Sequence, residues 1–339
     1  MTRRVRKSPL VRAIQRVASA MTRTAFETGA REAGKAVART VEAMAAPHRP
    51  PAGAGDWIAG QAIGAAGVRR FHLFRPPGIR NGERVPLIVM LHGCGQTAAQ
   101  FARSTRMNRI ALRERCLLLY PEQDRSANPQ GCWNWYDTRS RHADAEAATL
   151  MAAIDQACLL YPVDRAAVAL AGISAGASMA ALLASRWPAR FRAVVMHCGV
   201  PPGSAHSAAS ALAAMRGRRA AGSLTAEVGG LPPLLVIHGL ADPVVAPVNG
   251  RAAAEQWAAA AGAQAGPPRR VQRGARYPMT VTDYRAGRRL VARLVEVDEL
   301  GHAWSGGDAG QMFSDPRGPD ASRMVWRFLA AQIRQRLAE

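Results

Sequence analysis

The sequence predicts an α/β fold in which helices cover both faces of a mostly parallel sheet. From residue 57 onward, short runs that are apolar throughout alternate with longer stretches of helical periodicity. Strands buried on both faces are apolar throughout, and strands joined through helices run parallel. Hydrophobic residues fill 48% of the 339 positions, enough for a sizeable core and too many for a disordered chain.

Seven strands and five helices are expected in the main domain. The strands are FHLF at 71–74, PLIVML at 86–91, CLLLY at 116–120, AVALAG at 167–172, AVVMHC at 193–198, PLLVIHG at 233–239 and LVARLVEV at 290–297. The helices are expected at 97–114, 143–160, 175–187, 249–261 and 320–336. Residues 56–339 are therefore expected to form one α/β domain.

Residues 1–55 are expected to form a separate N-terminal extension. Apolar residues recur at helix spacing from Leu10 to Met21 with arginines elsewhere on the wheel, which predicts a basic amphipathic helix over 1–46. The proline- and glycine-rich stretch 47–55 follows as a linker. Such a helix can bind a granule or an anionic membrane surface, or it can dock on the main domain.

The net charge of +21 raises the question of a nucleic-acid partner. Nearly all of the positive charge is arginine, with lysine only at Lys7 and Lys35. No zinc finger, RNP motif or helix-turn-helix pattern accompanies it. We therefore expect a solvated, arginine-rich surface and no nucleic-acid partner.

The basic N-terminus resembles a signal peptide, but Arg12, Gln15 and Arg16 interrupt its apolar core. No apolar run approaches the ~20 residues that cross a bilayer. A cytoplasmic location is therefore expected, with granule association as an option and an extracellular location as the alternative.

Five widely spaced cysteines exclude a disulfide-dense scaffold and show no CxxC metal spacing. One pair could still be bridged, and Cys94 with Cys132 is the pair to test. The sequence contains no HExxH, Walker A or GxGxxG motif, which excludes the zinc-hydrolase, P-loop and Rossmann classes. No metal and no cofactor are expected.

The segment VALAGISAGASMA at 168–180 places Ser174 between Gly172 and Gly176. This G-x-S-x-G pattern is typical of a nucleophile elbow, a sharp turn between a strand and a helix that exposes a serine hydroxyl. Glycines flank the serine because side chains there would collide with the strand and the helix. The pattern alone is weak, but an apolar strand precedes it and a helical stretch follows, so Ser174 is the expected nucleophile.

An elbow serine is followed along the chain by an acid and then by a histidine. Asp242 comes after the strand 233–239, and His302 comes after the strand 290–297, so both are expected at the same sheet edge as Ser174. The alternatives left open are Asp283, Glu296 and Asp298 as the acid, and His197, His206 and His238 as the base.

An oxyanion hole needs two backbone donors. The N–H of Ala175, directly after the nucleophile, is one candidate, and the N–H of Cys94, after the strand 86–91, is the other. Three tryptophans on loops at this edge, Trp133, Trp135 and Trp304, suggest an apolar acyl or polymer surface, although Trp133 or Trp135 could instead pack its loop down.

Five sequence blocks in order resemble the esterase family of polyhydroxybutyrate depolymerases. They are LHGCGQTAAQFARSTRMNRIA, YPEQDRSANPQGCWNWY, YPVDRAAVALAGISAGASMA, HGLADPVVAPVNG and GHAWSGG followed by DPRGPDASRMVWRF. The resemblance spans about residues 57–330. It implies an α/β-hydrolase fold, a triad of Ser174, Asp242 and His302, and oxyanion donors at Cys94 and Ala175.

The resemblance implies a serine esterase that acts on short-chain polyhydroxyalkanoate or its oligomers through an acyl-enzyme on Ser174. Secreted polymer-degrading relatives usually carry a cleavable leader and a C-terminal polymer-binding domain, and neither is expected here. Two alternatives remain. One is an esterase for feruloyl or acetyl esters of polysaccharide, and the other is a non-catalytic protein of a granule or membrane surface.

Overall fold

The structure is a computed structural model that describes residues 48–80, 82–224 and 230–337. The chain divides into two units, Met1–Arg49 and Pro50–Glu339, and the description below concerns the second. The amphipathic helix expected over 1–46, with its contact to a granule or membrane, lies outside the described residues. The expected domain boundary after residue 55 stays a prediction.

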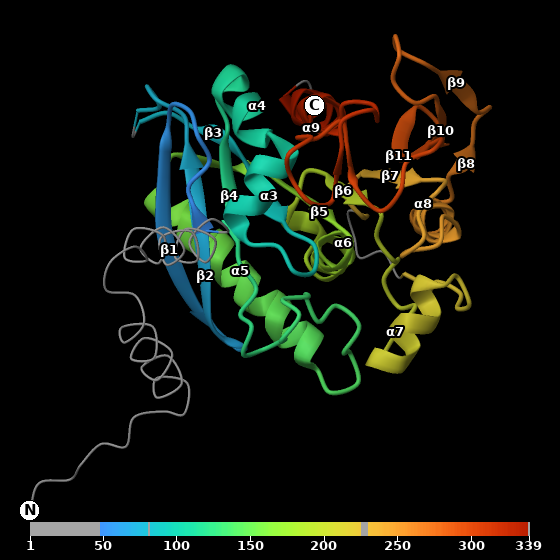
Figure 1. The fold of residues 1–339 in the computed structure, drawn as a ribbon, viewed down its shortest axis with the longest axis horizontal. Coiled ribbons are helices and arrows are strands. Elements are labelled where there is room, and N and C mark those ends of the chain that lie inside the picture. Colours follow the sequence, from blue (N-terminus) through green and yellow to red (C-terminus); the bar gives the residue numbers. More distant parts are fainter. Residues whose placement is uncertain (1–47, 81, 225–229, 338–339) are drawn as a thin grey trace, which may run out of the picture. The chain divides into compact units, whose positions relative to one another are not determined.

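The second unit is built around an eleven-stranded sheet, with strand order β1-β2-β4-β3-β5-β6-β7-β11-β10-β8 and with β9 paired to β10. Six central strands, from β4 to β11 in that order, run parallel, while β1, β2 and β10 pair with their neighbours antiparallel (Figure 1). The strands are β1 (Asp56–Gly64), β2 (Gly67–Arg75), β3 (Val85–Leu91), β4 (Leu117–Pro121), β5 (Val163–Ile173), β6 (Val194–His197), β7 (Leu234–Gly239), β8 (Gln264–Ala265), β9 (Arg269–Val271), β10 (Met279–Ala286) and β11 (Arg289–Val297).

Helices cover both faces of this sheet, which confirms the predicted α/β architecture. One face packs against α5 (His142–Leu160), α6 (Ala175–Arg186) and α8 (Val248–Ala260), and α7 (Ala208–Met215) adds residues to the same core. The opposite face packs against α3 (Ala98–Thr105), α4 (Met107–Glu114) and α9 (Ala321–Leu337). A short 3₁₀ turn (Pro188–Arg190) follows α6, and two short strands, β12 (Trp304–Ser305) and β13 (Ser314–Asp315), form a small separate pair.

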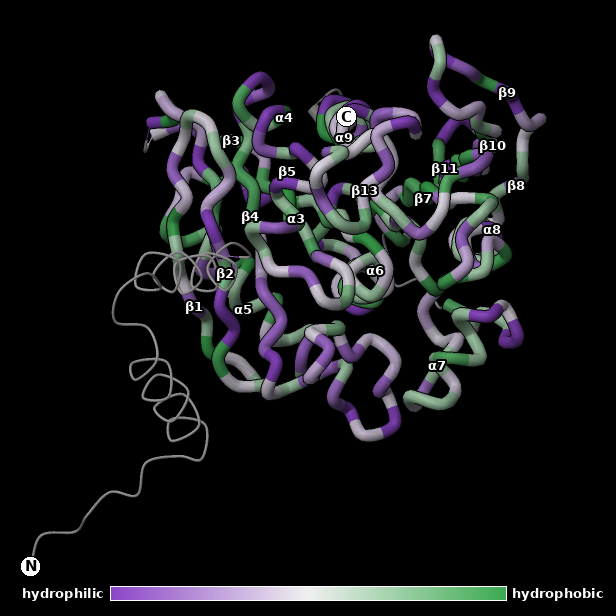
Figure 2. The backbone as a smooth tube through the Cα atoms, in the orientation of Figure 1, coloured by the Kyte–Doolittle hydropathy of each residue, from purple (hydrophilic) through white to green (hydrophobic). Residues whose placement is uncertain are grey.

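The central strands are apolar throughout because successive side chains enter two different cores. In β7, Leu234 and Val236 face the core beneath α5, α6 and α8, whereas Leu235 and Ile237 face the core beneath α3, α4 and α9. Figure 2 shows hydrophobic segments along these central strands and hydrophilic ones on the outer turns. A strand buried on both faces cannot alternate apolar with polar residues.

The structure contains strands that could not be predicted from continuous apolar runs in the sequence. β1 and β10 lie toward the two edges of the sheet and leave most of their residues partly or fully exposed, so neither forms a continuous apolar run. The helix predicted at 97–114 is two helices, because Arg106 adopts a left-handed conformation with φ of 55°. Thr97 and Gln100 form a reciprocal capping box at the start of the first.

Within the described residues, no helix has the length and apolar character that a bilayer crossing requires.

Candidate active site

Ser174 lies at the junction of β5 and α6, where the chain turns sharply. Its backbone has φ of 55° and ψ of −124°, a combination that non-glycine residues rarely adopt. The turn is held because the N–H of Ser174 donates to the carbonyl of His197 at 2.9 Å. The geometry is that of the predicted nucleophile elbow.

The two flanking glycines are required by close backbone packing. A Cβ at Gly172 would lie 2.4 Å from the carbonyl group of Gly176, and a Cβ at Gly176 would lie 2.2 Å from the carbonyl oxygen of Leu91. Real Cβ atoms do not come this close to backbone. The strand, the helix and the end of β3 can therefore meet at Ser174 only with glycine at both positions.

Asp242 and His302 are brought together at the carboxyl edge of the sheet, after β7 and β11 respectively. His302 Nδ1 lies 2.7 Å from Asp242 Oδ2. The other carboxylate oxygen, Oδ1, accepts from the N–H groups of Val244 and Val245, both at 2.9 Å. Because an ionised carboxylate can only accept, Nδ1 carries the proton and Nε2 is left as a free acceptor.

The carboxyl group of Asp242 is held in its charged form. Its burial raises the pKa, but the hydrogen bond from His302, the electrostatic interaction with that ring and the two backbone donors outweigh burial. The net result is a pKa below the usual value for aspartate. Asp242 is therefore an anion at neutral pH.

His197 connects the segments that carry Ser174 and His302 through two hydrogen bonds. The Ser174 N–H bonds to the His197 carbonyl, and the His197 ring accepts from the N–H of Ser305, three residues after His302. In the described part of the chain, no hydrogen bond joins the Ser174 hydroxyl to His302. Hydrogen bonds of this kind are often long without substrate, so the arrangement is compatible with a serine–histidine pair.

The alternative acids are all engaged with arginines. Asp283 receives two bonds from Arg293, at 2.5 and 2.7 Å. Glu296 pairs with Arg251 at 2.6 Å, and Asp298 pairs with Arg270. Asp242 is the acid that contacts His302.

Two of the alternative bases are buried and structural. His197 stacks on Trp304, with ring centroids 5.0 Å apart. His238 donates from Nε2 to the carbonyl of Val245 at 2.9 Å, so it braces the loop that presents Asp242. Burial lowers the pKa of both rings, that of His197 to about 3, and both are neutral. The third, His206, is only partly buried, and its backbone N–H bonds to the hydroxyl of Ser210 at the start of α7.

We expect the buried His197 to make the protein progressively less stable in mild acid. Below pH 6.5 the unfolded chain binds a proton at His197 that the folded chain does not accept until about pH 3. Between pH 7 and pH 5 this residue alone should remove about 2 kcal/mol of unfolding free energy. Urea unfolding of wild type and His197→Gln across this range measures the effect. The variant should show the shallower slope, and parallel slopes would contradict the assignment.

Cys94 and Ala175, which would supply the two oxyanion donors, line the same cavity as Ser174. This cavity of about 390 Å³ is lined by Cys94, Ser174 and Ala175, among others. Within the described residues, the backbone N–H groups of Cys94 and Ala175 have no hydrogen-bond acceptor. Ala175 is also the first residue of α6, where the helix N-terminus favours negative charge. Both N–H groups are available to an anion.

A disulfide joins Cys94 to Cys132, the pair singled out from the sequence. It ties the loop that follows β3 to the tryptophan-rich loop 131–136. A backbone bond from Gly95 N–H to the carbonyl of Gln130, at 2.8 Å, runs alongside it. The disulfide and the Gly95 hydrogen bond together hold the backbone at Cys94 in place.

A buried ion pair, Arg69 and Glu146, lies next to the loop 131–136 and anchors it. Arg69 and Glu146 have almost no exposed side-chain surface, and their Nη2 and Oε1 atoms are 3.4 Å apart. Glu146 also accepts from the Asn134 N–H at 2.8 Å, which anchors the loop. Gln123 bonds to both charged side chains, and its N–H donates to Nε2 of His92 at 3.1 Å.

The three candidate aromatic residues differ in their surroundings. Trp135 lines the cavity beside Ser174. Trp133 is fully buried, donates to the carbonyl of His92 at 3.0 Å and lies under Arg69. Trp304 is fully buried and donates to the hydroxyl of Ser322 at 3.0 Å. Trp133 and Trp304 are therefore not placed to contact a substrate, because burial and hydrogen bonding commit both to packing.

Much of the wall of the cavity beside Ser174 was not predicted from the sequence. α7 contributes Ala208, Ala211, Leu212 and Met215 to it. This short, alanine-rich helix has a weak apolar stripe, and its one local signal is the cap formed by Ser207 and Ser210.

One buried group of potential metal ligands adjoins the site. Ligand atoms of Cys198, His238 and Asp242 lie within 4.8 Å of one another. The group is poorly suited to a cation, because burial raises the pKa of the Cys198 thiol and the Asp242 carboxylate already accepts three hydrogen bonds.

Comparison with known families gives a match over residues 69–273 to the model described as esterase PHB depolymerase. The poly(3-hydroxyalkanoate) depolymerase C of Paucimonas lemoignei is 30% identical over 183 residues, 51% of this chain and 44% of that protein. Feruloyl esterase B of Neurospora crassa is 29% identical over 188 residues, 50% of this chain and 63% of that protein. The chain thus spans about half to two thirds of the length of these relatives.

Solved structures agree on the fold. An acetyl xylan esterase from Aspergillus awamori superposes with a TM-score of 0.61 at 16% identity, over 80% of this chain and 99% of that one. A dienelactone hydrolase-like promiscuous phosphotriesterase from metagenomic libraries gives 0.52 at 16% identity, over 84% and 99%. The fold is that of the α/β-hydrolases.

Proposed function

Because the chain belongs to the esterase PHB depolymerase family, we propose that it is a serine hydrolase of carboxylic esters. The observation that carries the proposal is the 2.7 Å contact between His302 and a buried, backbone-anchored Asp242, at the sheet edge that also holds Ser174 on a strained turn. The function follows from these side chains and not from the fold alone, since the same fold supports many activities.

In the proposed reaction, the Ser174 hydroxyl attacks the ester carbonyl while Nε2 of His302 takes its proton. Asp242 holds the imidazole in the required tautomer and stabilises its charged form. The N–H groups of Cys94 and Ala175 bind the oxyanion of the tetrahedral intermediate, and each such donor is worth ~3 kcal/mol of barrier. The alcohol leaves with the proton from His302. Water, activated by the same histidine, then releases the acid from Ser174.

The proposed substrate class is a short-chain polyhydroxyalkanoate, poly-3-hydroxybutyrate above all, or its oligomers. The cavity beside Ser174 is walled by Trp135, Val200, Leu212 and Met215, which suits an apolar acyl group. The depolymerase of Paucimonas lemoignei supports a polyester substrate. The feruloyl esterase supports the second candidate, a feruloyl ester of polysaccharide. Acetylxylan esterase A of Emericella nidulans, 24% identical over 219 residues, supports an acetyl ester.

Of the two locations that the sequence leaves open, the Cys94–Cys132 disulfide favours the extracellular one. Disulfides persist in oxidising compartments and are rare in the cytosol. Binding of a granule or anionic membrane through residues 1–46 remains part of the proposal for a polymer-associated enzyme.

A fluorophosphonate probe tests the proposal, because it labels only an activated serine. We expect stoichiometric labelling on the peptide that contains Ser174, complete loss in Ser174→Ala, and full labelling in Ser185→Ala. Ser185 is a matched control on the same helix, bonded to the Leu182 carbonyl. An unlabelled wild type would support the non-catalytic alternative. Hydrolysis of amorphous polyhydroxybutyrate, hydroxybutyrate oligomers, p-nitrophenyl butyrate and methyl ferulate then ranks the substrates.

A further inference from the structure

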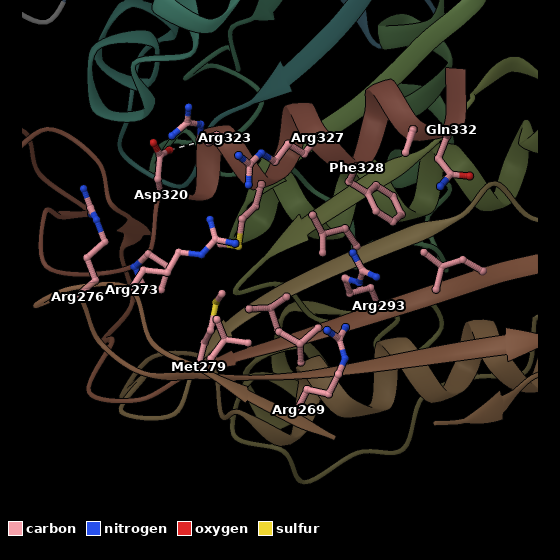
Figure 3. A pocket seen from close by; sticks show the side chains of 18 of the residues that line it. Arg269, Arg273, Arg276, Met279, Arg293, Asp320, Arg323, Arg327, Phe328 and Gln332 are labelled. Atoms are coloured by element: carbon pink, nitrogen blue, oxygen red, sulfur yellow. Dashed lines mark hydrogen bonds between the residues drawn. The ribbon is translucent and has the colours of Figure 1, made fainter. Parts of the chain in front are cut away.

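A second cavity, of about 540 Å³, opens on the α9 side of the sheet. Its walls are β10 and β11, the segment 269–276 and the exposed face of α9 (Figure 3). It shares no lining residue with the cavity beside Ser174. We call it the arginine cleft, because seven arginines line it against a single carboxylate, Asp320.

The floor of the arginine cleft is apolar. Met279 and Val281 of β10, Val295 of β11 and Phe328 of α9 line it, each with less than a tenth of its surface exposed. Figure 3 shows Phe328 projecting from α9 over the strands that carry Met279 and Arg293. A ligand that fills this floor must bring an apolar chain.

The rim of the cleft carries cations that the protein does not neutralise. Arg293 pairs with Asp283, which also lies near Arg269 and Arg285, so one carboxylate serves three guanidinium groups. Arg273, Arg323 and Arg327 form no ion pair within the described residues. Asp320 accepts from the backbone N–H of Arg323, not from its guanidinium group.

We propose that the arginine cleft binds an amphiphilic anion, an acyl chain that ends in a carboxylate. The chain would lie on Met279, Val281 and Phe328, and the carboxylate would be held by Arg323 and Arg327. The planar guanidinium group matches a carboxylate with two parallel hydrogen bonds, and neighbouring uncompensated cations strengthen the attraction. The volume lies within the range of small-molecule sites. The proposal does not depend on ester hydrolysis at Ser174.

Calorimetric titration of the full chain with decanoate tests the proposal. Decanoate should bind at least about tenfold more tightly than acetate, which lacks the chain, and than decyltrimethylammonium, which reverses the charge. The affinity should fall as salt is raised. Equal binding of decanoate and decyltrimethylammonium would overturn the role of the arginines, and equal binding of acetate would overturn the apolar floor.

A double variant locates the site. Arg323→Gln/Arg327→Gln should weaken decanoate binding by at least about tenfold, with an unchanged melting temperature, since both side chains are exposed. The matched control is Arg84→Gln/Arg165→Gln, which removes two exposed arginines outside the cleft and should change affinity less than about twofold. Equal weakening in both variants would show a general charge effect and contradict the proposal.

Discussion

Replacing Asp242 by Asn is expected to lower kcat for p-nitrophenyl butyrate by about 10⁴-fold while KM changes little. Oδ1 of Asp242 accepts two backbone N–H groups, from Val244 and Val245. In the variant these donors will hold the amide oxygen in that place and turn the amide NH₂ toward His302. Nδ1 of His302 must then accept, so its proton moves to Nε2, which can no longer take the proton of Ser174.

The alternative acids supply matched controls. Glu296→Gln and Asp298→Asn each remove a carboxylate that pairs with an exposed arginine, Arg251 or Arg270. Both should retain kcat within about twofold, because neither acid contacts His302. Steady-state kinetics of the three variants tests whether Asp242 is the acid of the triad. An active Asp242→Asn enzyme, or an equal loss in Asp298→Asn, would contradict the proposed triad.

Replacing Arg69 by Met is expected to destabilise the protein by about 3–5 kcal/mol. The Glu146 carboxylate is buried, and Arg69 is its cationic partner at 3.4 Å. Without that partner the anion is left uncompensated in the core, beneath the loop that carries the disulfide. Urea unfolding measures the loss of unfolding free energy. The exposed pair Arg113–Glu114 is the control, and Arg113→Met should cost less than about 1 kcal/mol.

The double variant Arg69→Met/Glu146→Gln separates charge from packing. The glutamine oxygen can still accept from the Asn134 N–H, but no buried anion remains. We expect the loss of unfolding free energy in the double variant to be at least about 1 kcal/mol smaller than the summed losses in Arg69→Met and Glu146→Gln. Simple additivity would show that Arg69 acts through packing against Trp133 and not through its charge.

The sequence predicts the centre of this fold better than its edges. Central strands such as β3, β5 and β7 are buried on both faces, so each is a recognisable apolar run. β1, at one edge of the sheet, and β10, flanked only by the short strands β8 and β9, mix polar with apolar residues. The left-handed break at Arg106 has no distinctive sequence signal, because neither glycine nor proline marks it.

The candidate site also has a part that the sequence predicts and a part that it does not. Ser174, Asp242 and His302 each follow a recognisable central strand, so topology alone brings them to one edge. The buried residues that support the site could not be predicted in this way. Arg69, Gln123 and Glu146 are separated by up to 77 residues along the chain, and no spacing marks them as partners. Only the folded chain shows that they anchor the loop joined to Cys94.

The strained turn at Ser174 has a consequence for protein engineering. A serine held at φ of 55° and ψ of −124° costs of order 1–3 kcal/mol, and glycine would tolerate this backbone more readily. Selection for thermostability alone would therefore favour glycine at position 174 and discard the hydroxyl that the surrounding architecture presents. Heat tolerance and turnover must be selected together in this chain.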